Sequence, residues 1–460
     1  MWQPDLKAYR GPRYLAIAEA LCADIRSGRL RPGERLPPQR ELSQLLQVNF
    51  GTVTKAYALA AERGLIQGET GRGTFVRKDA PASRTPWPNE GRVPGRVDMR
   101  SDFPCSLADD PVFRQAFEGL GRHPDLGRLL QYQPGACMPA HREAAMVWLR
   151  RMGLEAPLER IVVTNGALHG GFLALMAITS PGDTIFTESM TSPAIRSMAA
   201  MLHLVLKPVA MDAEGLVPED LEEKLTQHQC KAVYLIPGFQ NPTTAVMPPA
   251  RRRAIARIAE RSGLYIIEDD VFGGLVPAGL APVSALVPER SFYLTSFSKG
   301  IAPGLRVGYA VAPERFGRAM LAGLRVTAWM ASPLLAEVLS EWIYDGTAER
   351  LVKRQADKIA ARESIARRKL NGLSLSSRPT CPHMWLKLPP AMRESEAVMA
   401  LDQLGIDVTP GEYFAAGSGF SPGGLRLCLG QVADLSVLEE SCRLIYNTLS
   451  QAPAVPGGQV

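Results

Sequence analysis

Hydrophobic residues recur every three or four positions in three short stretches near the start of the chain. The first stretch covers residues 14–27 and the second covers residues 39–47, and this spacing places the apolar side chains on one face of a helix. A turn at 48–51 precedes a third helix, which Thr52 caps or opens and which runs to about Arg63. The chain therefore begins with a supporting helix and two further helices joined by a tight turn.

Two short apolar runs follow the third helix. Residues 65–66 and 74–76 flank the turn Gly71-Arg72-Gly73, which predicts a β-hairpin. Helices joined by a tight turn and followed by such a hairpin are typical of a winged helix-turn-helix. The alternative is a bare three-helix domain that serves an interaction.

After residue 98 the pattern changes to short apolar runs that alternate with helical stretches such as Pro249–Ser262. Strands are predicted at 161–164, 184–187, 232–236, 265–268, 291–295 and 307–311. Such alternation predicts an α/β fold with a largely parallel sheet, and ligands bind beyond the carboxyl ends of its strands. Gly166, Asn241, Asp269 and Lys299 all follow predicted strands. Each has an ordinary interpretation as a cap, turn or solvated residue, but their shared position predicts a site.

The chain is divided by a linker rich in proline. Residues 77–97 contain four prolines and no apolar periodicity, which is typical of a semi-rigid connection. Beyond residue 332 we expect a long charged helix near 349–369, a strand at 383–389 and a loop at 408–414. The predicted organisation is a DNA-binding domain at 1–78, a linker at 79–97, a large domain at 98–331, a smaller C-terminal region at 332–450 and a flexible tail at 451–460.

Composition and charge refine this organisation. Hydrophobic residues make up 46% and charged residues 21% of the chain, which excludes wholesale disorder. The net charge is +6, but residues 1–79 hold 13 Lys and Arg against 8 Asp and Glu, and everything after residue 97 carries about −1. The basic charge therefore marks the N-terminal domain, as double-stranded DNA requires.

Other compositional features exclude several classes of protein. The seven cysteines are scattered and form no Cys-x-x-Cys pair, so we expect no disulfide framework, no metal site and a reducing cytoplasm. The first residues lack a basic-then-apolar leader, and no run approaches 18 apolar residues. We therefore expect no membrane segment.

The N-terminal sequence resembles a known family of DNA-binding domains. Residues 31–76, RPGERLPPQRELSQLLQVNFGTVTKAYALAAERGLI followed by GRGTFV, are similar to the winged helix-turn-helix of the GntR family of bacterial regulators. The resemblance implies DNA contacts from Arg40, Thr52, Lys55 and Arg72, in line with the entry of a recognition helix into the major groove. Gln39 and Asn49-Phe50 depart from the common pattern, so the operator sequence does not transfer.

The rest of the chain resembles the fold-type I aminotransferases. QNPTT, IIEDDVFGGL and TSFSKGIAPGLRVGY carry this resemblance, which runs from about 98 to 447. Together with the N-terminal domain, the chain resembles the MocR subfamily of GntR regulators. The resemblance implies pyridoxal 5'-phosphate as cofactor, with Lys299 as its Schiff-base lysine, Asp269 on the pyridinium nitrogen and Asn241 on the phenolic oxygen.

The same resemblance implies the remaining contacts of the cofactor and effector. Arg426 matches the arginine that grips the carboxylate of an amino compound, and Tyr132 matches a tyrosine that reaches the phosphate of the partner subunit. The phosphate cup is implied to consist of Ser296, Ser298 and Arg306 with the helix N-terminus at Gly166, Ala167 and Leu168. Such sites lie between two chains, so we expect a homodimer. An exchange of DNA-binding domains between the chains is left open.

Three positions depart from the aminotransferase pattern. Leu168 stands where glutamine is usual, Ser192 stands where an aromatic residue stacks on the ring, and Phe272 stands where tyrosine donates to the phenolic oxygen. His169 either substitutes for one of these contacts or has a structural role. The losses weaken cofactor binding by roughly 1–3 kcal/mol, so we expect cofactor binding without robust catalysis and at most a residual aminotransferase half-reaction.

These observations favour a sequence-specific transcriptional regulator whose aminotransferase-like domain senses pyridoxal phosphate or an amino compound. Sensing requires an effector that binds two conformational states with different affinity. One alternative is an active aminotransferase that carries a DNA-binding domain. Another is a regulator that has lost its cofactor, against which Lys299, Asp269, Asn241 and Arg306 all argue.

Overall fold

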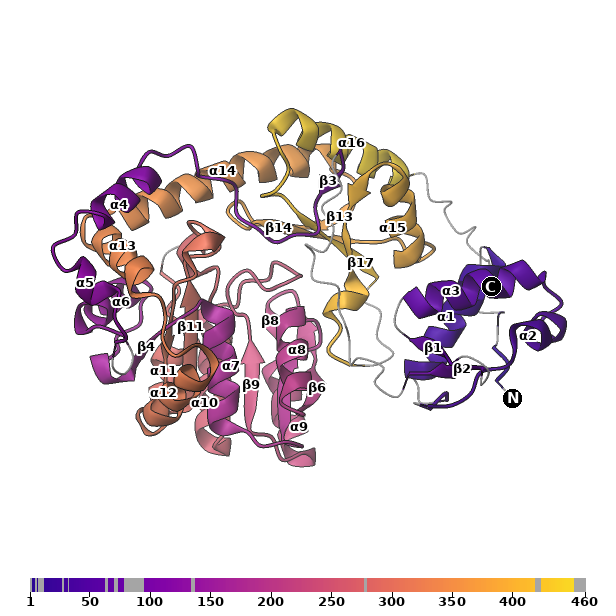
Figure 1. The fold of residues 1–460 in the computed structure, drawn as a ribbon, viewed down its shortest axis with the longest axis horizontal. Helices are drawn as coiled ribbons and strands as arrows, with labels where there is room; N and C mark the ends of the chain where they lie inside the picture. The colour runs from indigo at the N-terminus through magenta and orange to yellow at the C-terminus, as the bar shows by residue number, and fades with distance from the viewer. Residues whose placement is uncertain are drawn as a thin grey trace. The chain divides into compact units, whose positions relative to one another are not determined.

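The computed structural model describes residues 2–4, 6, 12–26, 29–31, 33–62, 65–69, 73–77, 95–133, 137–276, 279–417 and 423–450 (Figure 1). The chain forms two compact units, and the division along the chain falls between Thr85 and Pro86. Most of the predicted linker and the whole predicted tail at 451–460 lie outside the described residues.

The N-terminal unit has three helices and a hairpin. They are α1 (Arg13–Arg26), α2 (Gln39–Leu45), α3 (Phe50–Glu62), β1 (Ile66–Glu69) and β2 (Gly73–Val76). The strands pair antiparallel, with Ile66 opposite Val76. Apolar side chains from all five elements form one core, including Ile17, Leu21, Leu42, Val53, Ala56, Ile66 and Val76. The predicted winged helix-turn-helix is confirmed.

The prediction for the start of the third helix was wrong. The helix begins at Phe50, two residues before Thr52. The side chain of Asn49 accepts the Gly51 amide at 2.8 Å, and its carbonyl oxygen accepts the Thr52 amide at 2.9 Å. Because Asn49 takes up these first amides, the turn closes earlier than the hydroxyl of Thr52 suggests.

A seven-stranded sheet forms the centre of the second unit, in the order β4-β12-β11-β10-β9-β5-β6. Only β12 runs antiparallel to its neighbours among these pairings. The strands are β4 (Ile161–Thr164), β5 (Thr184–Glu188), β6 (Val205–Val209), β9 (Ala232–Leu235), β10 (Tyr265–Asp269), β11 (Ser291–Ser296) and β12 (Gly308–Val311). The six predicted strands are present. The sequence did not reveal β6, because this edge strand is half-exposed and contains Lys207 and Pro208.

Helices cover both faces of this sheet, which explains why its strands read as unbroken apolar runs. Val162 and Leu294 pack on one face with α7 (Ala167–Ile178), α8 (Pro193–Met201) and α12 (Gly317–Ala328). Val233 and Ile266 pack on the other face with α9 (Pro218–Gln227) and α10 (Pro249–Ser262). Further helices and strands of the large domain are α4 (Val112–Leu120), α5 (Leu126–Leu129), α6 (Pro139–Arg151), β7 (Met211–Asp212), β8 (Gly215–Leu216) and α11 (Val283–Leu286). Helix α13 (Pro333–Tyr344) begins the predicted C-terminal region and shares a core with α6 of the large domain.

The C-terminal region has its own four-stranded sheet, in the order β13-β14-β17-β16. Its elements are α14 (Thr347–Lys369), β13 (Ser374–Ser376), β14 (His383–Lys387), α15 (Glu394–Gln403), β15 (Ile406–Asp407), β16 (Thr409–Pro410), β17 (Gly424–Cys428) and α16 (Leu435–Ser450). The predicted long helix and the strand at 383 are confirmed. The loop predicted at 408–414 is instead β16 and a 3₁₀ turn at Gly411–Phe414, because Thr409 and Pro410 pair with the edge of β17.

One short strand joins the beginning of the second unit to its C-terminal region. Strand β3 (Val97–Asp98) pairs parallel with β15, with Val97 opposite Ile406. The first residues of the predicted large domain therefore pack against the C-terminal region.

Candidate functional site

Four predicted site residues lie at one edge of the large sheet. Gly166 follows β4, Asn241 follows β9, Asp269 ends β10 and Lys299 follows β11. Because β4, β9, β10 and β11 point the same way, their carboxyl ends meet at this edge. The predicted site is thus assembled from segments that are far apart in the sequence.

Lys299 is held by residues that the sequence did not single out. Its ammonium group lies 3.2 Å from Oδ2 of Asp102, donates to the carbonyl oxygen of Asp102, and lies 5.9 Å from the centre of the Phe103 ring. Burial raises the pKa of Asp102, but the positive charges of Lys299 and Arg426 outweigh burial and hold it below its ordinary value. Asp102 is therefore an ionised carboxylate in the site.

Asp269 lies at the end of the central strand. The hydroxyl of Tyr234 donates to its Oδ2, and the amide of Val271 donates to its Oδ1 at 3.2 Å. Burial raises the pKa of Asp269 to about 6, while Tyr234 and the charge of Lys299 act in the opposite direction. Asp269 and Lys299 therefore influence each other across the site.

The predicted phosphate cup is assembled around Arg306. Its Nη1 donates to Oγ of Ser298 at 3.4 Å, and its Nη2 donates to the carbonyl of Asn165 at 2.7 Å. The amide of Ser298 donates to Oγ of Ser296 at 3.2 Å. Gly166 adopts a φ of +90°, and a Cβ at this position would lie 3.1 Å from Nη2 of Arg306. The missing side chain thus leaves space beside the guanidinium.

Helix α7 points its N-terminus at this cup. Gly166 is its N-cap, and Ala167 and Leu168 are its first two residues. The first amides of a helix have no acceptor within the helix, and they favour an anion together with the helix dipole. Glycine at the N-cap leaves these amides open to a ligand.

Arg426 lies almost completely buried on β17, at 4% exposure. Its Nη1 donates to Oδ1 of Asn241 at 2.9 Å, its Nη2 donates to the carbonyl of Arg100 at 2.7 Å, and its guanidinium lies 4.8 Å from the ring of Phe414. The arginine predicted to grip a carboxylate is therefore held in place by Asn241 and by residue 100.

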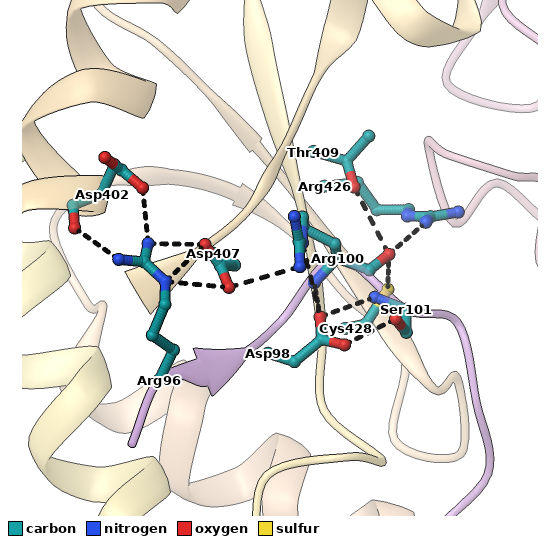
Figure 2. Close-up of polar contacts among 9 residues, drawn as sticks. All are labelled: Arg96, Asp98, Arg100, Ser101, Asp402, Asp407, Thr409, Arg426 and Cys428. Atoms are coloured by element: carbon teal, nitrogen blue, oxygen red, sulfur yellow. Dashed lines mark hydrogen bonds and ion pairs between the residues drawn. The ribbon is translucent and has the colours of Figure 1, made fainter. Parts of the chain in front are cut away.

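Residues 96–103, which we call the strap, include β3 and end at Asp102 and Phe103, which contact Lys299. Figure 2 shows the polar contacts of the strap between Arg96 and Ser101. Arg96 begins the strap, and its Nη2 pairs with Asp407 at 2.6 Å and with Asp402 at 2.5 Å. These ion pairs fix the end of the linker to the C-terminal region.

The middle of the strap is folded by its own side chains. Oδ1 of Asp98 accepts the amides of Arg100 at 2.8 Å and Ser101 at 3.1 Å, and the Ser101 hydroxyl donates to Oδ2 at 2.6 Å. Figure 2 shows Arg426, Thr409 and Cys428 meeting at the carbonyl oxygen of Arg100. The strap therefore holds Asp102 beside Lys299.

Two of the three departures from the expected pattern, Phe272 and Ser192, have clear structural roles. Phe272 is fully buried, with its ring 5.6 Å from that of His383. His383 was not predicted; its Nε2 lies 3.2 Å from the carbonyl of Gln240, and burial lowers its pKa to about 4. Ser192 is the N-cap of α8, where it accepts the amide of Ala194 at 3.4 Å.

His169 has both ring nitrogens engaged by the protein. Nδ1 accepts the amide of Asn165 at 3.2 Å, so Nε2 carries the proton toward Oγ1 of Thr327 at 2.8 Å. Burial and the nearby charge of Arg306 lower its pKa. This arrangement favours the structural role over a substitute contact to the cofactor.

Tyr132 does not join the Lys299 cluster through any described contact of this chain. Its side chain is 76% exposed and its ring lies 5.2 Å from that of Trp329. The two rings form an exposed aromatic surface on the large domain.

The predicted DNA-binding residues lie on α2 and α3. Arg40 is exposed near the start of α2, with its guanidinium 5.9 Å from the ring of Phe50. Thr52 and Lys55 are three residues apart on α3 and share a face. Arg72, the predicted contact from the wing, lies outside the described residues. The hydroxyl of Tyr57 donates to the carbonyl of Pro37 at 2.9 Å and so ties α3 to the segment before α2.

Within the described part of the chain, no helix is both long enough and apolar enough to cross a membrane.

Two family models match this chain. The model described as aminotransferase class I and II matches residues 102–443, and the model described as bacterial regulatory proteins, gntR family, matches residues 13–76. These ranges correspond to the two units of the structure.

Relatives cover the chain almost from end to end. The HTH-type transcriptional regulator YdeF of Bacillus subtilis is 28% identical over 97% of this chain and 96% of its own length. The pyridoxine biosynthesis transcriptional regulator PdxR of Corynebacterium glutamicum is 29% identical over 88% of this chain and 90% of its own length. Among solved structures, an archaeal alanine:glyoxylate aminotransferase matches with a TM-score of 0.71 and 21% identity, over 77% of this chain and 91% of its own, a likeness that concerns the fold.

Proposed function

Because this chain belongs to the aminotransferase class I and II family and carries a GntR-family DNA-binding domain, as in the MocR subfamily, we propose that it is a transcriptional regulator controlled through pyridoxal phosphate. The effector is the cofactor itself or an amino compound that bonds to it. The DNA partner implies action in the cytoplasm.

The observation that carries this proposal is the convergence of four kinds of group at one sheet edge. They are an amine on Lys299, a carboxylate on Asp269, a guanidinium on Arg306 and a helix N-terminus without a side chain at Gly166. A guanidinium, serine hydroxyls and the first amides of a helix are the donors that bind a phosphate group. The chemistry of these residues matches the cofactor that the family implies.

Each residue would have a separate task toward the cofactor. Lys299 would bond to the aldehyde, Asp269 would pair with the ring nitrogen, and Ser296, Ser298 and Arg306 would bind the phosphate with the first amides of α7. When bound, pyridoxal phosphate supplies an aldehyde that bonds to amines and a ring that withdraws electrons.

Asn241 and Arg426 would set the contacts on the effector side. Because Oδ1 of Asn241 accepts from Arg426, its amide nitrogen remains as a donor toward the phenolic oxygen. Phe272 has no hydroxyl, so the phenolic oxygen receives one donor fewer than the family pattern supplies. This loss weakens the ring as an electron sink, which favours sensing over turnover.

Spectroscopy and DNA binding test the proposal together. We expect the purified protein to develop a visible absorption band with pyridoxal phosphate, and the band to disappear in Lys299→Ala. We also expect a mobility shift with the DNA upstream of its own gene, at a concentration that changes when the cofactor or an amino compound is added. Steady turnover of amino donors at ordinary enzyme rates, with DNA binding indifferent to ligand, would favour an active aminotransferase instead.

We also propose that two chains form a homodimer. Large apolar side chains are exposed on one part of the large domain, namely Leu130, Tyr132, Val326 and Trp329. Burial of such a patch stabilises association. In the dimer Tyr132 would reach the phosphate of the partner subunit, which accounts for its separation from the Lys299 cluster.

A further inference from the structure

Lys299 forms an ion pair with a carboxylate that the proposed cofactor chemistry does not use. Asp102 offers this amine both its Oδ2, at 3.2 Å, and its own carbonyl oxygen. The side chains of Lys299 and Asp102 are 21% and 10% exposed. Water therefore screens the ion pair only partly, and the attraction is stronger than on an open surface.

Asp102 depends on this amine in return. Its Oδ1 is buried and has no hydrogen-bond partner among the described residues. The charges of Lys299 and Arg426 together keep the pKa of Asp102 low despite burial. Removing the ammonium group would leave a buried carboxylate without its closest positive charge, which is unfavourable.

The strap prevents Asp102 from turning away. Its neighbour Ser101 is bonded to Asp98 through both amide and hydroxyl, and the carbonyl of Arg100 is held by Arg426. A carboxylate that directly follows two residues fixed in this way is a permanent counter-ion rather than a passing contact.

The protonation of Lys299 decides what it can do. An ammonium ion has no free electron pair, so it must first give up a proton before it can attack an aldehyde or remove a proton from carbon. We propose that Asp102 is a positioning residue that holds Lys299 as an ammonium ion whenever it is not bonded to the cofactor. The domain then captures an amino compound without completing transamination.

The replacement of Lys299 by the incoming amine conserves bonds and protons under this arrangement. The nitrogen of the amino compound forms a bond to the cofactor's aldehyde carbon, and the bond from that carbon to the nitrogen of Lys299 breaks. Two protons pass from the incoming ammonium group to Lys299, which leaves as an ammonium ion paired with Asp102. The carbon-bound proton of the amino compound stays in place, so reversal of the exchange releases that compound unchanged.

This inference rests on the proposed cofactor binding, and the test separates the two. Asp102→Asn removes the charge and keeps both the shape and the carbonyl acceptor. Asp109→Asn is the matched control, because Asp109 is an exposed carboxylate paired with Arg354 on α14. Asp102→Glu keeps the negative charge, so it distinguishes the loss of charge from a purely structural effect of the substitution.

The first measurement is the rate at which cofactor-free protein gains the absorption band with pyridoxal phosphate at neutral pH. We expect this rate to rise at least tenfold in Asp102→Asn and to remain unchanged in Asp109→Asn and Asp102→Glu. The second is the single-turnover loss of the band with an amino acid, which we expect to be at least tenfold faster in Asp102→Asn.

The outcomes are distinct. If the wild-type protein gains no band, the proposed function fails and this inference fails with it. If the band forms but Asp102→Asn leaves both the rate of band formation and the single-turnover rate unchanged, only the role of Asp102 is overturned. A parallel change in Asp102→Glu would also overturn it, since the charge would then not be responsible.

Discussion

The guanidinium of Arg426 donates to the side-chain oxygen of Asn241 at 2.9 Å, joining a strand of the C-terminal region to the loop after β9. The same guanidinium holds the carbonyl of Arg100. A ligand carboxylate that binds Arg426 must compete with two protein oxygens, so its binding changes contacts in three segments at once.

Replacement of Arg426 by methionine tests its part in effector recognition. We expect the affinity for an amino acid to fall by on the order of 10- to 100-fold, because a charge-assisted contact to the carboxylate is lost. The affinity for an amine without a carboxylate should change little. Absorption titrations with both ligands measure this. Thr409→Val is the control, since it removes a hydrogen bond to the same Arg100 carbonyl without removing the charge of Arg426. An equal loss of affinity for both ligands in Arg426→Met would contradict the role of Arg426.

Gly166→Ala tests the phosphate cup. The added Cβ meets Nη2 of Arg306 at 3.1 Å, and φ at this position is +90°. Gly182 has the same φ with nothing within 4 Å, so Gly182→Ala reproduces the backbone strain alone. We expect each variant to lose about 1–2 kcal/mol of stability and only Gly166→Ala to bind pyridoxal phosphate at least tenfold more weakly. Unfolding curves and cofactor titrations separate the two effects.

Asp269 should make the cofactor-free protein less stable at neutral pH than at mildly acidic pH. Its folded pKa of about 6 lies above the unfolded value of about 3.9, so the folded state holds the proton more tightly and this contribution is lost as pH rises through 4 to 6. Asp269→Asn escapes this loss. We expect it to be more stable than the wild type by about 1–2 kcal/mol at pH 8, after loss of the Val271 bond, and no more stable at pH 4.

Denaturant unfolding at both pH values checks this prediction. Tyr234→Phe provides a matched variant, because removing the hydroxyl that lowers the pKa of Asp269 should enlarge the pH dependence. The same gain for Asp269→Asn at pH 4 and pH 8 would refute the assignment. We further expect Asp269→Asn to bind pyridoxal phosphate more weakly. Asp269 would then lower the stability of the protein while it strengthens cofactor binding.

Lys55→Ala tests the recognition helix. A lysine that neutralises one phosphate contributes about one unit to the slope of log affinity against log salt concentration. We expect the slope of operator binding to fall by about 1 in Lys55→Ala. Arg29→Ala is the control, since Arg29 pairs with Asp24 rather than lying on α3. Fluorescence anisotropy over a salt series measures both, and an unchanged slope for Lys55→Ala would remove it from the interface.

Val326→Glu tests the proposed dimer. Val326 is 82% exposed on α12, and a charge in the centre of an apolar interface is strongly unfavourable. We expect a shift from dimer to monomer in sedimentation or light scattering. Met201→Glu, also at a highly exposed apolar position but at the end of α8, should remain dimeric.

Elements with a clear apolar pattern were predictable from the sequence, and elements that mix polar and half-exposed residues were less so. The strand at Ile161–Thr164 and the helix Pro249–Ser262 have their predicted bounds, because long apolar runs and periodic patterns mark them directly. Strand β6 mixes Lys207 with half-exposed residues and gives no such signal.

Predicting the site required knowledge of which strands are neighbours. Asp269 and Lys299 could be placed from their positions after strands, whereas the partners that fix their chemistry could not. Tyr234 reaches Asp269 because β9 and β10 pair in parallel, with Tyr234 opposite Ile267. Asp102 is 197 residues from Lys299 in a segment with neither helical nor strand periodicity, so no local pattern connects them.

The strap also connects Arg96, at the end of the predicted linker, to the backbone oxygen that Arg426 holds. Strand β3 pairs with β15 and is clamped by Arg96, while the carbonyl of Arg100, two residues beyond β3, is held by the arginine that would meet a ligand. The end of the predicted linker is therefore a few residues along the chain from the backbone oxygen that Arg426 holds. One short piece of backbone thus joins the predicted effector arginine to the point at which the linker enters the second unit.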